Sequence, residues 1–150
     1  MKYSIRKADK KDEKRICELF IEMLKTIYNT DDVKGYDEGY LDHYFADKEN
    51  VILVAESESE VIGFISVEVH REEHEYIYLD DFSVSVNKRG KGTGNALLRE
   101  AEEYGKSVKV SAYLLHVEKS NDRAFNFYKR NGYSVFEDQG ERLLLKKDFE

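Results

Sequence analysis

The sequence predicts one domain of the mixed α/β class (α+β mixed), spanning residues 1-150. A chain of 150 residues is the usual size of one compact domain, and it contains no repeat, linker or low-complexity tract. Apolar residues make up 41% and charged residues 37%, which excludes disordered and membrane-spanning chains. The apolar spacing changes along the chain in the order β-α-α-β-β-β-α-β-α-β-β. We therefore expect a mixed sheet whose later half alternates strand and helix.

The first third of the chain predicts a strand and two helices. Residues 3–7 alternate as in a strand, and apolar residues then recur every three or four positions from Ile16 to Ile27, as on one helix face. Asp9 or Asp12 can cap the start of this helix, because a carboxylate there accepts from free N–H groups. A second, poorer helix is predicted over Tyr36–Ala46.

The rest of the chain predicts six strands and two helices. The strands, which show β alternation or apolar runs, are expected over residues 51–56, 61–70, 76–86, 108–117, 133–136 and 142–146. The helices are expected over 96–104 and 121–130. We expect Gly105 to end the first helix, and Asn131 with Gly132 to end the second.

Composition also bears on partners and location. The net charge of -7 disfavours nucleic acid and anionic membranes and favours a cationic partner, although the same charge also serves solubility. No apolar run reaches the roughly 18 residues of a membrane span, and the chain is charged from Lys2 onward, so we expect a cytoplasmic protein. The lone Cys17 excludes an internal disulfide, and its place on an apolar helix stripe predicts burial.

A glycine-rich segment follows the strand over 76–86 and opens the next helix. Backbone N–H groups at such a junction bind phosphate oxygens, and the charges of Arg89 and Lys91 add attraction for an anion. A P-loop needs Ser or Thr where Gly92 stands, and a dinucleotide fingerprint needs glycine where Asn95 stands, so neither motif applies. The segment predicts a diphosphate site, with a merely flexible turn as the alternative.

Residues in and before this turn resemble the cofactor motif of the GNAT acetyltransferases. The family pattern is Arg or Gln, two residues, Gly, one residue, and Gly or Ala, which Arg89, Gly92 and Gly94 satisfy. An apolar-x-Val signature on the preceding strand is met by Phe82 and Val84. The chain departs from the family at Val86, often proline, and at Thr93, often aliphatic, but neither change removes a backbone N–H.

A second family signature resembles the segment near the end of the chain. Its named positions are filled by Val117, Asn121, Ala124, Phe127, Tyr128, Gly132 and Tyr133. Helical spacing also places Asn121, Ala124, Phe125 and Tyr128 on one face, so an amide and a phenol would face one cleft. Taken singly, Tyr128 is as well explained as a core aromatic and Asn121 as a helix cap.

The resemblance implies a GNAT acyltransferase fold, with a central mixed, mostly antiparallel sheet flanked by about four helices. It implies an N-acetyltransferase that moves the acetyl group of acetyl-CoA to a primary amine by direct attack, without a metal. The acceptor would be a small molecule such as a polyamine or aminoglycoside, or a peptidyl amine, and the protein a monomer or homodimer. The alternative is a non-catalytic acyl-CoA sensor or partner-binding module, which would not need a proton donor.

The same resemblance assigns site residues. The cofactor would be held by Phe82, Ser83, Val84, Arg89, Gly90, Lys91, Gly92, Thr93, Gly94, Asn95, Asn121 and Ala124. Tyr128 would protonate the leaving thiolate, and a backbone N–H of the Phe82–Val84 segment would stabilise the oxyanion. For the general base, Asp81 is the first choice and His116 the second. Asp80, Glu68 and His70 also lie on the flanking strands.

Two further patterns bear on the reaction. Residues 70–74 match the H-x-x-E-H form of a zinc site, but a turn between strands cannot place both histidines on one helical face, so we exclude a metal. Acidic residues gather where the family builds its acceptor site and would attract a cationic amine: Asp31, Asp32, Asp37, Glu38, Asp42, Asp47 and Glu49. A solvated helix face explains them equally well. The short strings at 78–82 and 126–130 resemble di- and polyamine acetyltransferases.

Overall fold

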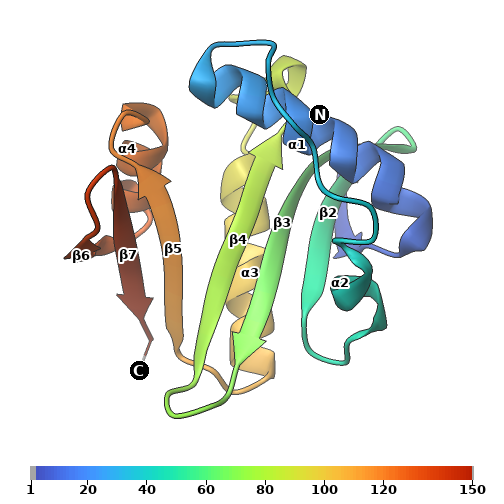
Figure 1. Ribbon diagram of the computed structural model, residues 1–150. Coiled ribbons are helices and arrows are strands. Elements are labelled where there is room, and N and C mark those ends of the chain that lie inside the picture. The colour runs from blue at the N-terminus through green and yellow to red at the C-terminus, as the bar shows by residue number, and fades with distance from the viewer. Residues whose placement is uncertain (1–2, 150) are drawn as a thin grey trace.

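Helices cover both faces of a seven-stranded sheet in the computed structural model, which describes residues 3–149 (Figure 1). The strands are β1 Ser4–Lys7, β2 Val51–Ser57, β3 Glu60–His70, β4 Tyr76–Val84, β5 Ala112–Glu118, β6 Ser134–Asp138 and β7 Arg142–Asp148. The helices are α1 Glu13–Tyr28, α2 Asp42–Ala46, α3 Thr93–Ser107 and α4 Asp122–Arg130, with 3₁₀ turns η1 Lys10–Asp12 and η2 Val86–Lys88. The expected mixed α/β class is confirmed.

The sheet order is β1-β2-β3-β4-β5-β7-β6, and every neighbouring pair except β4 and β5 is antiparallel. The parallel pair is short, because only Ile77–Leu79 of β4 pairs with Tyr113–Leu115 of β5. Beyond that point the two strands diverge, which leaves the middle of the sheet split at one end (Figure 1). The expected mostly antiparallel sheet is therefore confirmed. Its one parallel pair, β4 and β5, separates beyond these three residues.

Two apolar clusters hold the layers together. On one face Leu97, Leu98 and Ala101 of α3 pack against the sheet in the larger cluster. On the other face Ile16 and Leu19 of α1 belong to the second cluster, together with side chains of α2, β2 and β3. Burying each leucine or isoleucine side chain contributes about 1.5–3 kcal/mol, so these two layers stabilise the sheet on both sides of the split. Cys17, expected to be buried, is half-buried at the edge of the second cluster.

The helix predicted over Tyr36–Ala46 is wrong in extent, because only the five residues of α2 are helical. Gly39, with φ of +79°, interrupts helical geometry ahead of α2. The side chain of Tyr36 instead reaches Asp81, and that of Tyr40 reaches Asp80. Long-range contacts therefore override a weak local pattern here.

Two other predicted boundaries are also corrected. Gly105 does not end α3, which continues to Ser107. A Cβ at Gly105 would overlap the Tyr113 hydroxyl, so this glycine permits close packing rather than termination. The strand predicted from Val108 begins only at Ala112, since Lys109 has φ of +64° in the turn before β5.

Asp9 and Asp12, the two residues predicted to cap the first helix, both accept backbone hydrogen bonds in the turn before α1. The Asp9 side chain accepts from the Lys11 N–H and caps η1. Asp12 accepts from the Asp9 N–H and forms a salt bridge with Arg6 at 2.8 Å. No helix within residues 3–149 combines the length and apolar character that a bilayer crossing requires.

Candidate functional site

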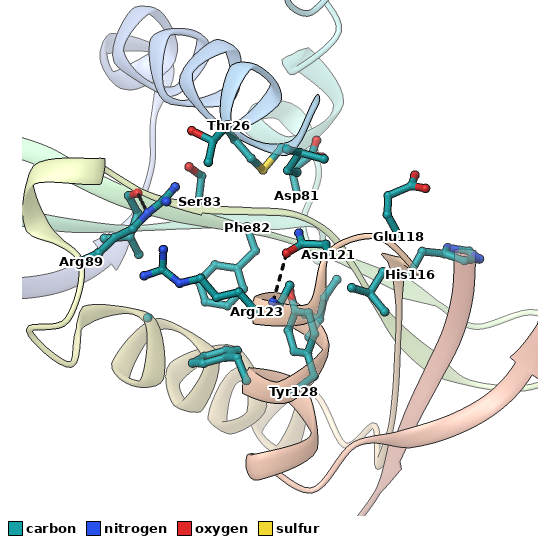
Figure 2. Close-up of a pocket in the computed structure, with 18 of the residues that line it drawn as sticks. Thr26, Asp81, Phe82, Ser83, Arg89, His116, Glu118, Asn121, Arg123 and Tyr128 are labelled. Atoms are coloured by element: carbon teal, nitrogen blue, oxygen red, sulfur yellow. Dashed lines mark hydrogen bonds between the residues drawn. The ribbon is translucent and has the colours of Figure 1, made fainter. Parts of the chain in front are cut away.

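The split between β4 and β5 opens into a cleft of about 720 Å³. One wall comes from the second half of α1, through Phe20, Met23, Leu24, Thr26, Ile27 and Tyr28. The opposite wall comes from the start of α3 and from α4, while β4 and β5 supply the edges (Figure 2). Because α1 and α3 lie on opposite faces of the sheet, the cleft connects the two faces through the split.

Glycines shape the entry to α3. Gly90 and Gly92 have φ of +78° and +84°, the left-handed region that favours glycine, and no atom lies within 4 Å of a Cβ built at either. Gly92 is the N-cap residue, and no side chain caps the helix. Ala96 N–H bonds back to Gly92 O at 3.1 Å, so the N–H groups before it have no partner within the helix. This helix end can therefore receive an anion.

Two guanidinium groups project toward the same part of the cleft. Arg89 Nε donates to Val84 O at 3.1 Å, which fixes the side chain beside the glycines. Burial and the nearby charge of Arg123 lower the pKa of Arg89. In the described part of the chain neither arginine forms a salt bridge. Figure 2 shows both side chains in the cleft, Arg89 from the end of η2 and Arg123 from α4. The pair, beside a helix N-terminus, favours a doubly charged anion.

The structure brings nearly all the predicted cofactor residues to this cleft. Those on its wall are Phe82, Ser83, Val84, Arg89, Gly90, Gly92, Thr93, Gly94, Asn95, Asn121 and Ala124. Lys91 is exposed and is not part of the wall. Thr93 is 1% exposed, and its hydroxyl has no hydrogen-bond partner among residues 3–149. Arg123, which the sequence analysis missed, also lines the cleft.

Tyr128 on α4 lines the cleft beside Phe82, with ring centroids 6.4 Å apart (Figure 2). Burial raises the pKa of Tyr128, and the neighbouring Tyr78 and Asp81 raise it further. Its hydroxyl has no hydrogen-bond partner within the described residues, so it stays protonated and free to donate. Asn121 Oδ1 accepts from Ala124 N–H at 3.2 Å, which makes Asn121 the N-cap of α4.

A bulge in β4 turns two successive carboxylates toward the cleft. Ile65 pairs with Phe82 and Val67 with Leu79, so Asp80 and Asp81 together face a single residue of β3. Tyr36 Oη donates to Asp81 at 2.5 Å. Burial first, and the charge of Asp80 second, raise the pKa of Asp81 to about 7.

Asp80 and Glu68 extend the negative charge along the sheet. Tyr40 and Tyr44 donate to Asp80 at 3.1 and 3.4 Å, and Tyr44 also donates to Glu68 at 2.9 Å. Burial and the charge of Glu68 raise the pKa of Asp80. We call Glu68, Asp80 and Asp81 the carboxylate array. The sequence placed its three carboxylates on strands flanking the cleft but missed the tyrosines, because their contacts depend on the path of the chain before α2.

His116, the second predicted base, lines the cleft with both ring nitrogens engaged. Nδ1 lies 2.6 Å from Tyr78 Oη, and Nε2 lies 2.8 Å from Gln139 Oε1. The amide oxygen can only accept, so Nε2 carries hydrogen, and in the neutral ring Tyr78 donates to Nδ1. Burial raises the pKa of Tyr78 to about 12. His70 contacts Glu68 at 3.1 Å and stacks on Tyr76 outside the cleft.

Known proteins share this sequence pattern. A model of the Acetyltransferase (GNAT) family matches residues 16–133. The uncharacterized N-acetyltransferase YhfO of Bacillus subtilis (strain 168) is 33% identical over 145 residues, covering 91% of this chain and 92% of that protein. The spermidine N(1)-acetyltransferase of Thermoplasma acidophilum is 29% identical over 100 residues, covering 67% of this chain and 60% of that protein.

A solved structure shares the fold. The crystal structure of PaiA N-acetyltransferase from Thermoplasma acidophilum, in complex with coenzyme A, aligns with a TM-score of 0.81 at 24% identity. The alignment covers 99% of this chain and all of that one, at 100%. The likeness confirms the overall arrangement of strands and helices expected from the sequence.

Proposed function

Because the chain belongs to the GNAT family of N-acetyltransferases, we propose that it transfers the acetyl group of acetyl-CoA to a primary amine by direct attack on the thioester. One observation carries the proposal: a single cleft is lined by the glycine-rich N-terminus of α3, the phenol of Tyr128 and the carboxylate of Asp81. The spermidine N(1)-acetyltransferase among its relatives supports a cationic amine as acceptor. A cytoplasmic location, a single domain and a homodimer stay predictions from the sequence.

The diphosphate of acetyl-CoA fits the end of the cleft formed by η2 and α3. The N–H groups of the Gly90–Asn95 segment would donate to its oxygens, with Arg89 and Arg123 balancing its charge. The thioester would then lie along β4 from Phe82 to Val84, where β4 has no pairing with β5. A free backbone N–H of this segment would stabilise the oxyanion that forms during attack.

Asp81 is the base we assign to the incoming amine. An alkyl ammonium with a pKa of about 10.4 must lose a proton before it can attack. A carboxylate with a pKa of about 7 is close to the working pH, which makes it an efficient acceptor. His116 has both ring nitrogens already engaged, so Asp81 is the better candidate.

Tyr128 is the acid we assign to the leaving group. As the new C–N bond forms and the C–S bond breaks, the thiolate takes the Tyr128 proton, and the amine's protons leave through Asp81 and water. The high pKa of Tyr128 keeps its proton in place until the thiolate forms. In this proposal Asp81 takes a proton from the amine, and Tyr128 gives one to the thiolate.

The test is thiol release from acetyl-CoA, measured across polyamines, aminoglycosides, amino acids and lysine peptides. Release that depends on an added amine, with mass spectrometry identifying the acetylated product, is the expected result. Calorimetric titration with CoA measures in parallel whether the protein binds the cofactor. CoA uptake without release for any amine would favour the sensor, and absence of uptake would overturn the proposal.

A further inference from the structure

The carboxylate array lacks the cations that accompany other enclosed carboxylates in this protein. Asp12 is paired with Arg6 at 2.8 Å, and Glu102 with Lys147 at 3.1 Å. In residues 3–149, no lysine or arginine forms a salt bridge with any member of the array. Its contacts are tyrosine hydroxyls and His70. Grouped carboxylates that have no lysine or arginine partner are costly to enclose, so the array favours binding a positively charged group.

The array has length as well as charge. The bulge places Asp81 and Asp80 in succession, and Glu68 pairs in register with Tyr78, three residues from Asp81 along β4. Three strand residues span roughly 10 Å, so the carboxylates form a row rather than a single point. Asp81 lies at the end near Tyr128, whereas Glu68 lies at the far end.

The surroundings of the array suit an aliphatic cation. The rings of Phe20, Tyr36 and Tyr40 stack in series, with centroids 3.8 and 4.9 Å apart, so Tyr36 is covered on both faces and only the outer ring faces remain for methylene groups and ammonium ions. Ser66 lies on the same face of β3 as Glu68, opposite the bulge, and is 0% exposed. Its hydroxyl has no hydrogen-bond partner in the described structure, which leaves an unused acceptor beside the carboxylates.

We propose that Glu68 and Asp80 bind a second cationic nitrogen of a linear diamine or polyamine whose reacting amine lies between Asp81 and Tyr128. The proposal rests on the proposed function, because it extends the acceptor site from Asp80 and Asp81, which line the cleft, to Glu68, which lies beyond the cleft wall and shares the Tyr44 hydroxyl with Asp80. It makes Glu68 and Asp80 specificity-determining residues. A peptidyl amine or a simple monoamine lacks a second charge at this spacing and gains nothing from the far end of the row.

A matched pair of substrates tests the proposal. 1,4-Diaminobutane and 1-aminobutane share a four-carbon chain and differ in the second amine. For the wild type we expect kcat/KM to be at least about 10-fold higher for the diamine, equivalent to about 1.4 kcal/mol. Glu68→Gln and Asp80→Asn should bring this ratio close to one, mainly by raising KM for the diamine. Glu73→Gln, in the exposed turn before β4, should keep the wild-type ratio.

A binding measurement separates this proposal from the proposed function. Calorimetry of spermidine into CoA-saturated protein should show affinity that falls at least about 10-fold in Glu68→Gln. Circular dichroism checks that each variant is folded. Equal kcat/KM for both four-carbon amines, an unchanged ratio in both variants, or a preference for lysine peptides or aminoglycosides would overturn the further inference alone. Loss of CoA uptake would instead overturn the proposed function.

Discussion

Tyr128 and Asp81 line one cleft, and burial raises the pKa of both groups, with different consequences for their protons. A phenol with a raised pKa keeps its proton, whereas a carboxyl group with a pKa near 7 exchanges one readily. The acid role that we propose for Tyr128 and the base role that we propose for Asp81 are thus both explained by burial in the cleft.

Replacing Tyr128 by Phe removes the proposed proton donor and leaves the ring in place. We expect turnover to fall at least about tenfold, because the thiolate must then leave unprotonated. The Kd for acetyl-CoA should change less than about twofold. Steady-state thiol release and calorimetry measure the two quantities. Tyr76→Phe, a tyrosine outside the cleft, serves as the control. Unchanged turnover in Tyr128→Phe would remove this residue from the chemistry.

Asp81→Asn should have opposite effects on activity and stability. The wild-type kcat/KM should rise with pH through about 7 as Asp81 ionises, and the variant should lose that limb of the profile. The folded-state pKa of Asp81 is raised, so the stability it contributes is present at low pH and lost as pH rises through about 7. The variant should therefore melt at a higher temperature than the wild type at pH 8, with a smaller gap at pH 5. A wild-type pH limb retained in Asp81→Asn would assign the base elsewhere.

At the scale of elements, the start of α3 and Arg123 of α4 line the same cleft although they are far apart in sequence, and we propose that together they bind the diphosphate. Arg123→Gln should weaken CoA binding about five- to tenfold, because one cation facing the diphosphate is lost. The KM for acetyl-pantetheine, which lacks the diphosphate, should hardly change. Arg99→Gln, on the exposed side of α3, is the matched control for calorimetry. An equal loss with acetyl-pantetheine would contradict the assignment of Arg123 to the diphosphate.

The contact between α3 and β5 gives a stability prediction. Gly105 packs against the Tyr113 hydroxyl so closely that a methyl group would overlap it. Tyr113 Oη also donates to Glu102 O at 2.6 Å and cannot move freely. We expect Gly105→Ala to lower the free energy of unfolding by about 2 kcal/mol, despite the better helix propensity of alanine. Urea denaturation measures the loss, and part of it should be recovered when Tyr113→Phe is added. A more stable Gly105→Ala protein would show that the helix adjusts without strain.

The residue pattern along the chain predicted those helices and strands whose formation depends on residues close in sequence. The long apolar repeat of α1, the alternation in the central strands and the glycines before α3 were each sufficient to locate their element. The short helix α2 and the extent of α3 were mispredicted, since Gly39 and Gly105 serve backbone geometry and packing that only the folded chain reveals.

The candidate site divides in the same way. The glycine turn, Tyr128 and Asp81 could be selected from motifs, and the structure brings them to one cleft. Arg123, Tyr36 and the bulge that aligns Asp80 with Asp81 could not, because each depends on strand register or on contacts between distant segments. A sequence motif can identify residues that are close in sequence, such as the glycines before α3. The residues around Asp80 and Asp81 come together only when the sheet and the segment before α2 are folded.

At the scale of the whole molecule, the split between β4 and β5 has a kinetic consequence. Helix α1 borders it on one face of the sheet, and α3 and α4 border it on the other. We therefore expect the two reactants to enter from opposite sides and to be present together, as the proposed direct attack requires. Neither must depart before the other arrives, so no acetylated form of the protein has to accumulate between half-reactions.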